Sequence, residues 1–361
     1  MSSLRDQRVE EVNALEALAL DRDFLRAPEE ECLATFWRQA SPGVAYWRCE
    51  LAARYLPGQM IGFDIKEVAW DDQHDRLSLP AHRGAAVWQF MGDDVRARVA
   101  LAWQDLGYRT LMEVDDNYTQ SPGKWGVSWT KDHADSKTLI GYSHEQHRHL
   151  CTLVDGIIVS TPYLADLYST FNDNIFVCRN SIEPADWPEY EKPDDGVFRI
   201  VFAGSAIHIF DYPMVKKALK WAQRQKDVEV TLMGFSRPPA FDGEVVSWVD
   251  SIDTYRVSLG KFDLGIAPLI NNRWNRGKSD IKAMEYAMMG AMPLPANVEA
   301  YRPWTDMGWP SPSTEDDWIE MIQYAVRNRD WVKEQAAVAK EYVLNERVIW
   351  KEVPRWREAI A

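Results

Sequence analysis

The segment Asn275–Gly290 (NRGKSDIKAMEYAMMG) combines a glycine, two lysines and a glutamate at spacings that suit a ligand with phosphate groups. Gly277 lets the backbone approach a ligand closely. Lys278 adds a positive charge just before a predicted helix over 281–289, whose first N–H groups attract anions. Because Lys278, Lys282 and Glu285 are spaced i, i+4 and i+7, we expect them on one face. The segment therefore predicts an anion-binding site.

The position of Glu285 suits the ribose of a nucleoside diphosphate held at that anion site. Lys278 and Glu285 would lie roughly 10 Å apart along a helix axis, a separation similar to that between the phosphates and the ribose hydroxyls. A carboxylate there accepts both ribose O–H groups in charge-assisted hydrogen bonds. Apolar neighbours make an unpartnered carboxylate costly. The alternative is a half-exposed surface glutamate beside a lysine.

Other familiar motifs are not supported. A Walker A loop needs a glycine five residues before Gly277, where Asn272 stands, and no GxGxxG of a dinucleotide site occurs. The four cysteines form no CxxC pair. The three histidines of the SHEQHRH segment do not have HExxH spacing, so we expect a solvated helix rather than a zinc site: His144, His147 and His149.

Strands and helices alternate around these residues. We predict strands over 32–39, 63–70, 85–91, 109–114, 155–160 and 174–178, and after residue 197 over 198–203, 228–233, 262–267 and 292–295. We predict helices over 46–56, 93–106, from Pro162, over 213–223 and 281–289, and along the tail 315–361, with Pro310, Pro312 and Pro354 as breaks. This order predicts parallel sheets with helices on both faces.

The prolines and acidic residues of 183–197 mark the best linker in the chain. We expect five parts: a helical appendage at 1–30, an acceptor-side domain at 31–185, a linker at 186–197, a donor-binding domain at 198–335, and C-terminal helices at 336–361 that pack back toward the N-terminal domain. Open α/β sheets bind ligands at the carboxyl ends of their strands. Two facing sheets would thus share one ligand cleft.

The pattern that starts at Leu264, LGIAPL followed by N-x-GKS-x-x-K-x-x-EY, resembles the donor-binding half of GT-B glycosyltransferases. It is most similar to the retaining group that includes glycogen and sucrose-phosphate synthases. The resemblance covers roughly residues 32–350, and within it Cys178–Asn180 resembles the end of the family's last N-domain strand. It implies an α/β protein with two Rossmann-like domains facing each other across a cleft, followed by a C-terminal helical tail.

The resemblance also implies residue roles. Glu285 would hold the ribose, and glycines and basic groups the diphosphate. The implied donor-binding residues are Gly204, Ser205, His208, Asn275, Gly277, Lys278, Ser279, Lys282 and Glu285. The implied acceptor-side residues are Gly43, Arg48, Asp115 and Asn117. As catalytic residues we expect Lys278, which would stabilise the leaving diphosphate, and Asp116.

The chain departs from the family pattern in two places. The family's E-x7-E motif would place its first glutamate at Gly277, which leaves recognition of the donor sugar open. The family's usual arginine and lysine are missing from 204–211. Lys278, helped by Arg273 or Arg276, would have to neutralise the diphosphate instead.

Three further side chains allow more than one interpretation. His208 is either a loop histidine or a contact to the donor, and Asp211 before Pro213 is more typical of a helix N-cap. Asp115 and Asp116 follow a predicted strand, as metal-binding acid pairs do in GT-A glycosyltransferases. Here the pair lies in the N-terminal half, away from the lysine–glutamate helix, and the resemblance to GT-B enzymes disfavours a metal. A metal site, an acceptor-side role, a catalytic role and a loop cap all stay open.

Composition limits the possible partners. The 361 residues carry a net charge of −14, so most of the surface repels nucleic acid and anionic lipid. No signal peptide pattern or apolar run of ~20 residues occurs. We expect a cytoplasmic protein with no integral membrane association, and most of its 17 tryptophans in the core.

We therefore predict a glycosyltransferase that moves a sugar from a nucleotide-diphosphate donor to an unknown acceptor, which could be a sugar, a protein or another small molecule. The resemblance implies retention of configuration, no metal and no cofactor besides the nucleotide sugar as co-substrate. Two alternatives stay open: a nucleotide-sugar epimerase of the same fold, and a non-catalytic nucleotide-sugar binding protein.

Overall fold

The computed structural model describes residues 34–37, 42–56, 58–61, 84–89, 101, 103–105, 107–119, 144–234, 241–247 and 251–361. The expected appendage at 1–30 and the expected strand at 63–70 lie outside these residues. Of the expected helix over 93–106, the structure describes residues 101 and 103–105, which are helical.

The first half forms a parallel sheet with strand order β2-β1-β3-β4-β5-β6. Its strands are β1 (Ala34–Trp37), β2 (Gly58–Ile61), β3 (Ala85–Gln89), β4 (Arg109–Val114), β5 (Gly156–Val159) and β6 (Ile175–Val177). All residues of β3 and β5 are buried, as expected for a parallel sheet covered on both faces. The described helical segments of this half are α2 (Pro42–Ala45), the π-helix η1 (Tyr46–Glu50), α3 (Leu51–Ala53), α7 (His144–Leu153) and α8 (Pro162–Tyr168).

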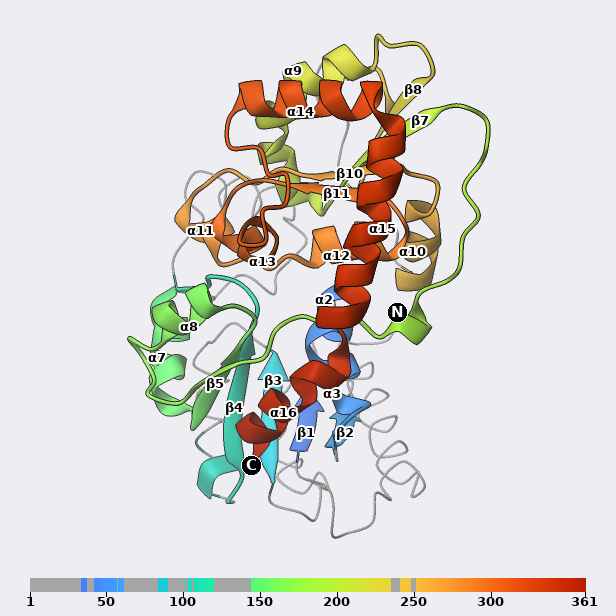
Figure 1. Cartoon of the computed structure of the whole chain (residues 1–361). Helices are drawn as coiled ribbons and strands as arrows, with labels where there is room; N and C mark the ends of the chain where they lie inside the picture. The colour runs from blue at the N-terminus through green and yellow to red at the C-terminus, as the bar shows by residue number, and fades with distance from the viewer. Residues whose placement is uncertain are drawn as a thin grey trace, which may run out of the picture.

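The second half forms a parallel sheet with strand order β11-β10-β7-β8-β9. Its strands are β7 (Phe198–Ala203), β8 (Val228–Met233), β9 (Glu244–Val246), β10 (Leu264–Ala267) and β11 (Met292–Pro295). Its helices are α9 (Tyr212–Ala222), α10 (Ile252–Leu259), α11 (Arg273–Arg276), α12 (Ile281–Met288), α13 (Arg302–Thr305), α14 (Glu315–Arg327) and α15 (Arg329–Glu346). Short 3-10 turns are η4 (Pro184–Asp186), η5 (Ala206–Phe210) and η6 (Glu299–Tyr301). Figure 1 shows the two sheets in separate lobes, joined by the linker and by the C-terminal helices.

In the residues that the structure describes, the chain passes between the halves at the linker and again after α15, and these two segments lie side by side. The backbone of Ile182 pairs with that of Val348 in a parallel bridge. After this point α16 (Ile349–Ile360) packs on the first half (Figure 1), where the rings of Trp356 and Phe36 are 6.1 Å apart. Pro354 lies inside α16, so its predicted role as a helix break is wrong. The C-terminal helix thus ties the second half to the first.

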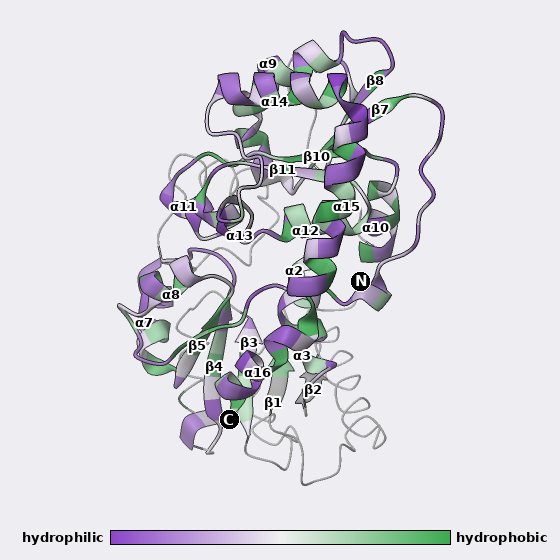
Figure 2. Cartoon of the chain, viewed as in Figure 1, coloured by the Kyte–Doolittle hydropathy of each residue, from purple (hydrophilic) through white to green (hydrophobic). Residues whose placement is uncertain are grey.

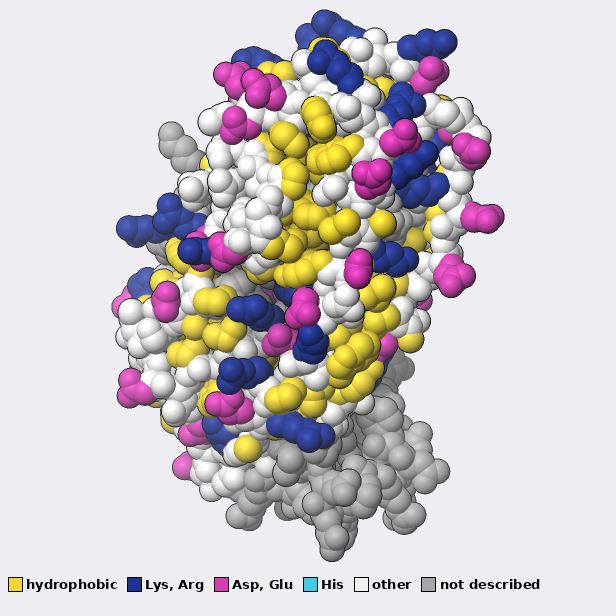
Figure 3. Space-filling model, viewed as in Figure 1, with side chains coloured by type: hydrophobic (Ala, Val, Ile, Leu, Met, Phe, Trp, Pro, Cys, Tyr) yellow, Lys and Arg dark blue, Asp and Glu magenta, His cyan; other side chains and the backbone are white. Residues whose placement is uncertain are grey.

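Apolar side chains form a core around each sheet. The largest fully buried side chains include four tryptophans, which confirms the expected core role for these residues: Trp88, Trp304, Trp318 and Trp356. Figure 2 shows hydrophobic residues in β5 and β10 and a mixture of hydrophobic and hydrophilic residues along α14 and α15. On the face in Figure 3, lysine and arginine side chains are interspersed with acidic ones. Within the described part of the chain, no helix is both long and apolar enough to span a membrane.

Candidate functional site

The loop Gly277–Asp280, here called the bridging loop, lies between α11 and α12 and contacts the rest of the chain at every residue. A Cβ added to Gly277 would lie 3.3 Å from Asn117 and 3.0 Å from Leu164. The next three residues bond to the first half or to the crossing segments: Lys278 to Asp116, Ser279 to Asn180, and Asp280 to Arg347. The bridging loop is therefore a junction between the two halves.

Lys278 and Asp116 form an ion pair across this junction. The Nζ atom of Lys278 lies 3.0 Å from Oδ2 and 3.4 Å from Oδ1 of Asp116, and the two side chains are 17% and 18% exposed. Burial raises the pKa of Asp116 to about 6, against the opposing effect of Lys278. Because Asp116 follows β4 and Lys278 follows β10, the pair marks the point where the carboxyl ends of the two sheets meet. The expectation that Asp116 lies away from the segment of Lys278 is therefore wrong.

The prediction that Lys278 shares a helix face with Glu285 is wrong. The helix α12 begins at Ile281, so Lys278 precedes it and reaches across to the first half instead. Lys282 does lie on the helix, and its Nζ donates to Oε2 of Glu285 at 2.9 Å.

Glu285 is held by two side chains of the second half. Its Oε2 accepts hydrogen bonds from Lys282 and from the hydroxyl of Tyr255 at 2.9 Å each, and Lys282 also donates to the Tyr255 oxygen at 3.0 Å. Glu285 is only 5% exposed, so the alternative of a half-exposed surface glutamate is wrong. Within the described part of the chain, both side-chain hydrogen bonds end on Oε2, which leaves Oε1 for a ligand.

Asp211 organises the residues that follow β7 and β10. Its Oδ1 accepts from the backbone N–H of Ile270 at 2.8 Å and from Nδ2 of Asn275 at 3.1 Å. Its Oδ2 lies 3.1 Å from Nδ1 of His208. Asp211 occupies the N-cap position of α9, as expected, but its side chain makes no capping hydrogen bond there. Its carboxylate instead accepts from three N–H donors outside α9.

His208 faces the two lysines of the site. Burial lowers the pKa of His208, and the positive charges of Lys278 and Lys282 add to that effect against the carboxylate of Asp211. The neutral ring therefore donates from Nδ1 to Asp211. A Cβ on Gly204 would lie 2.6 Å from the His208 ring, so only glycine allows this packing. Ser205 follows Gly204 and is exposed.

Arg48, predicted on the acceptor side, lies in a buried network. It is 1% exposed. It donates from Nε to Oε1 of Glu113 at 2.5 Å, and from Nη1 to Oδ1 of Asn180 at 2.9 Å. Burial raises the pKa of Glu113 to about 7. In this structure Arg48 thus makes its hydrogen bonds to buried groups of the protein. Gly43 lies in α2, with open space where a Cβ would stand.

The loop that carries Asp115, Asp116 and Asn117 rests on α7 and α8. The hydroxyl of Tyr168 donates to the backbone oxygen of Asp116 at 3.2 Å, and His147 lies 3.0 Å from the same hydroxyl. His147 is fully buried, so the expectation that the histidines of this helix are solvated is wrong for it. Burial lowers its pKa to about 3, so the ring is neutral. In the described residues, no group of three or more potential ligands is arranged to hold a metal ion.

Sequence reasoning missed Tyr255 and did not select Asp211, Asn180 or Arg347 as site residues. Asn180 carried a signal, because the Cys178–Asn180 segment resembles the end of the last N-domain strand in GT-B enzymes. Asp211 and Arg347 act through partners 64 and 67 residues away, and no local pattern indicates such contacts.

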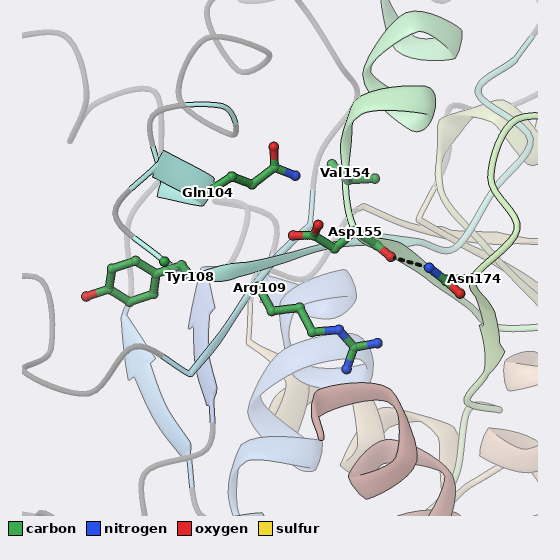
Figure 4. Close-up of a pocket in the computed structure, with 7 residues that line it drawn as sticks. Gln104, Tyr108, Arg109, Val154, Asp155 and Asn174 are labelled. Carbon is green, nitrogen blue, oxygen red and sulfur yellow. Dashed lines mark hydrogen bonds between the residues drawn. The ribbon is translucent and has the colours of Figure 1, made fainter.

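A separate depression of about 610 Å³ lies at the amino ends of β4 and β5 (Figure 4). Its lining residues are Gln104, Gly107, Tyr108, Arg109, Val154, Asp155 and Asn174. Thr110 donates to Asp155 from both its N–H and its hydroxyl, and Asn174 donates to the backbone oxygen of Asp155 at 2.9 Å. These groups tie strand ends together, at the opposite edge of the sheet from Asp116.

No family model matches the sequence, and no curated protein matches it. The structure is similar to Anabaena HepE, solved with UDP, at a TM-score of 0.58 and 12% identity, over 90% of this chain and 98% of HepE. It is also similar to S. aureus TarM, solved with fondaparinux, alpha-GlcNAc-glycerol and UDP, at a TM-score of 0.54 and 10% identity, over 76% of this chain. The chain spans about half the length of TarM, 55%.

A third similar structure is the glycotransferase of kitacinnamycin, at a TM-score of 0.50 and 9% identity, over 92% of this chain and 99% of that one. Identities this low establish the fold alone. This chain has two parallel sheets, of six and five strands, and the similarity to the three structures extends over most of it. The predicted fold is therefore confirmed: the chain has the GT-B fold of glycosyltransferases, with two Rossmann-like halves and a C-terminal helical tail.

Proposed function

We propose that this protein is a glycosyltransferase that takes its sugar from a nucleoside diphosphate donor. The observation that supports this most is the Lys278–Asp116 ion pair at the junction of the two sheets, with Lys282, Glu285 and His208 beside it. The site thus offers two ammonium groups and a neutral imidazole near one anchored carboxylate. UDP is the first nucleotide to test, because HepE and TarM were solved with it.

In this proposal the nucleoside diphosphate spans the site from the bridging loop to Glu285. The ammonium of Lys278 and the first N–H groups of α12 bind the diphosphate. The Oε1 atom of Glu285 accepts from the ribose hydroxyls, while Lys282 and Tyr255 hold its Oε2. As the bond between sugar and phosphate breaks, negative charge grows on the leaving oxygen, and Lys278 stabilises it.

Asp116 has a separate role in the proposal. When the diphosphate takes Lys278, the Asp116 carboxylate becomes available to accept a hydrogen bond from the acceptor hydroxyl and orient it. The acceptor oxygen then bonds to the anomeric carbon, the bond from that carbon to the phosphate oxygen breaks, and Asp116 takes the acceptor proton. Attack and departure on the same face of the sugar give the retention that the sequence resemblance implies. No metal ion takes part, so a chelator should leave turnover unchanged.

Thermal denaturation with UDP, GDP, ADP, dTDP and their sugars tests the proposal. A ligand at a hundredfold excess over its Kd stabilises the fold by about 2.7 kcal/mol. We expect one nucleotide series to stabilise the wild type and to lose most of that effect in Lys278→Ala. No stabilisation by any of them would overturn the proposal.

Incubating the selected nucleotide sugar without an acceptor separates the alternatives. A transferase leaves the sugar configuration unchanged, whereas an epimerase converts it. A panel of sugar, peptide and polyol acceptors then shows whether transfer occurs. Binding without transfer to any acceptor would favour the non-catalytic alternative.

A further inference from the structure

A buried chain of hydrogen bonds runs from the first sheet to the bridging loop. Glu113 on β4 accepts from Nε of Arg48 at 2.5 Å, and Nη1 of Arg48 donates to Oδ1 of Asn180 at 2.9 Å. The amide Nδ2 of Asn180 then donates to Oγ of Ser279 at 2.7 Å. This series of hydrogen bonds from Glu113 through Arg48 and Asn180 to Ser279 is here called the relay. It ends at the residue next to Lys278.

Burying the charged members of the relay costs free energy that apolar side chains in the same place would not cost. Arg48 and Glu113 are each 1% exposed, and burying an ion pair removes the hydration of both charges. The Nη2 atom of Arg48 is buried and finds no hydrogen-bond partner among the described residues, which adds a further desolvation cost. Apolar side chains of similar volume would pack here more cheaply. The directed hydrogen bonds, rather than the packing of these side chains, therefore indicate a function for the relay.

The hydrogen bonds of the relay fix the orientation of the Asn180 amide. Arg48 lies on the π-helix η1, a conformation that is rare and often occurs at functional sites. Its guanidinium also donates to the backbone oxygen of Cys178 at 2.7 Å, so it fixes the strand end just before Asn180. The Asn180 amide has both its oxygen and its nitrogen engaged, which fixes its orientation. The oriented Asn180 amide then fixes the position of the Ser279 hydroxyl, its hydrogen-bond partner.

The position of Ser279 controls where Lys278 can reach. Gly277 already packs against Asn117, and Asp280 is held by Arg347. With Ser279 fixed by Asn180, the backbone on both sides of Lys278 is tied to the first half. The Lys278 ammonium is then confined to the neighbourhood of Asp116.

We infer that Asn180 and Arg48 are positioning residues for the diphosphate: they hold the bridging loop so that Lys278 points into the junction between the halves. The inference rests on the proposed function, since it needs a nucleoside diphosphate as ligand. It also gives Arg48, a predicted acceptor-side residue, a role that needs no contact with the acceptor. Neither residue touches the ligand.

Calorimetric titration with uridine, UMP and UDP tests the inference, because these probes differ only in their phosphates. In the wild type we expect UDP to bind more tightly than uridine. In Asn180→Ala, we expect UDP to bind roughly tenfold more weakly, as for a lost hydrogen bond that orders a charged contact. Uridine should bind as in the wild type. Ser279→Ala should weaken UDP binding to the same extent as Asn180→Ala. The double variant should bind UDP little more weakly than either single variant, since both substitutions remove the same hydrogen bond.

Two further variants keep the test decisive. Arg48→Lys retains the charge but cannot reach Glu113, Cys178 and Asn180 together, so it should also weaken UDP binding without changing uridine binding. Arg109→Lys is the matched control, because it breaks an arginine bond to the backbone of α16, Nη1 to Ala359 at 2.7 Å, far from the loop. It should lower the melting temperature and leave the ratio of UDP to uridine affinity unchanged.

The outcomes separate the two proposals. If wild-type protein binds none of the four nucleoside diphosphates, the proposed function fails and the inference fails with it. If another nucleotide than UDP binds, the same series is run with its nucleoside. A second outcome is that the wild type binds the nucleoside diphosphate, but Asn180→Ala and Arg48→Lys weaken the binding of nucleoside and diphosphate equally, or weaken neither. The relay is then merely structural, and this inference alone is overturned.

Discussion

The Nζ atom of Lys278 lies 3.0 Å from Oδ2 of Asp116, although 162 residues separate them and each follows a strand of a different sheet. In this arrangement the Asp116 carboxylate neutralises the cation that the proposed diphosphate would need. In the proposed function, a diphosphate takes the place of Asp116 at Lys278. This exchange would link donor binding to the release of the carboxylate.

The first prediction concerns Lys278. Lys278→Ala should reduce turnover at least ~100-fold, because it removes the charge that we propose stabilises the leaving diphosphate. Initial rates of sugar transfer with saturating donor measure the effect. Lys217→Ala is the control, since Lys217 pairs with Glu315 at an exposed position. Near-normal turnover of Lys278→Ala would refute the assigned role.

The second prediction concerns Asp116 and pH. Asp116→Asn removes the competitor for Lys278, so UDP should bind roughly fivefold more tightly at about pH 8. The pKa of Asp116 is raised to about 6, so this carboxyl group is neutral below that pH and Lys278 is released. The affinity advantage of the variant should therefore disappear toward about pH 5.

The ratio of the two affinities is the quantity to follow, because the titration of UDP itself is common to both proteins. Turnover should move in the opposite direction and fall in Asp116→Asn, since the amide cannot take the proton of the acceptor hydroxyl. An affinity ratio that does not change with pH would show that Asp116 does not compete for Lys278.

Much of the fold was predictable because its elements carry local signals. The strands over 109–114, 198–203, 228–233 and 292–295 were predicted with the bounds that the structure shows. Continuous apolar runs between turn residues mark such buried strands. The strands β2 and β9 were missed, since short edge strands contain too few residues for a pattern.

The helix α10 was also missed, and with it Tyr255. Ser251 caps this helix by accepting from the N–H of Thr254, but eight residues with weak apolar periodicity do not predict a helix. The contact of Tyr255 with Glu285 depends on how α10 packs against α12. Similarly, the sequence around Asp211 suits an N-cap, and only the folded chain brings the Ile270 N–H and Asn275 to its carboxylate. Local pattern identified the charged residues, and tertiary packing determined their partners.

The third prediction concerns Gly277, where the family pattern has a glutamate. Its φ of −75° suits any residue, so the close contact with Asn117 and Leu164, not the backbone angle, disfavours a larger side chain here. Gly277→Glu should destabilise the fold by ~1–3 kcal/mol through overpacking and should not improve binding of a nucleotide sugar over the free nucleotide. Chemical denaturation and titration measure the two effects.

Gly43→Ala is the control for that substitution, because a Cβ there meets open space. It should leave both stability and binding near the wild-type values. If Gly277→Glu were as stable as the wild type and bound the nucleotide sugar more tightly, the two halves would separate more easily than the contacts at the bridging loop indicate.

The last prediction concerns Tyr255, the residue that sequence reasoning missed. Tyr255→Phe removes the hydroxyl that donates to Oε2 of Glu285 and accepts from Lys282. With one anchor lost, Glu285 should hold the ribose less firmly, and UDP should bind roughly fivefold more weakly. The loss should be smaller for 2′-deoxy-UDP, which offers only one ribose hydroxyl, and should appear equally for uridine. This pattern is the opposite of the one expected for Asn180→Ala, so the two variants together separate the ribose end of the site from its diphosphate end. An equal loss for UDP and its deoxy analogue would mean that Glu285 does not bind the ribose.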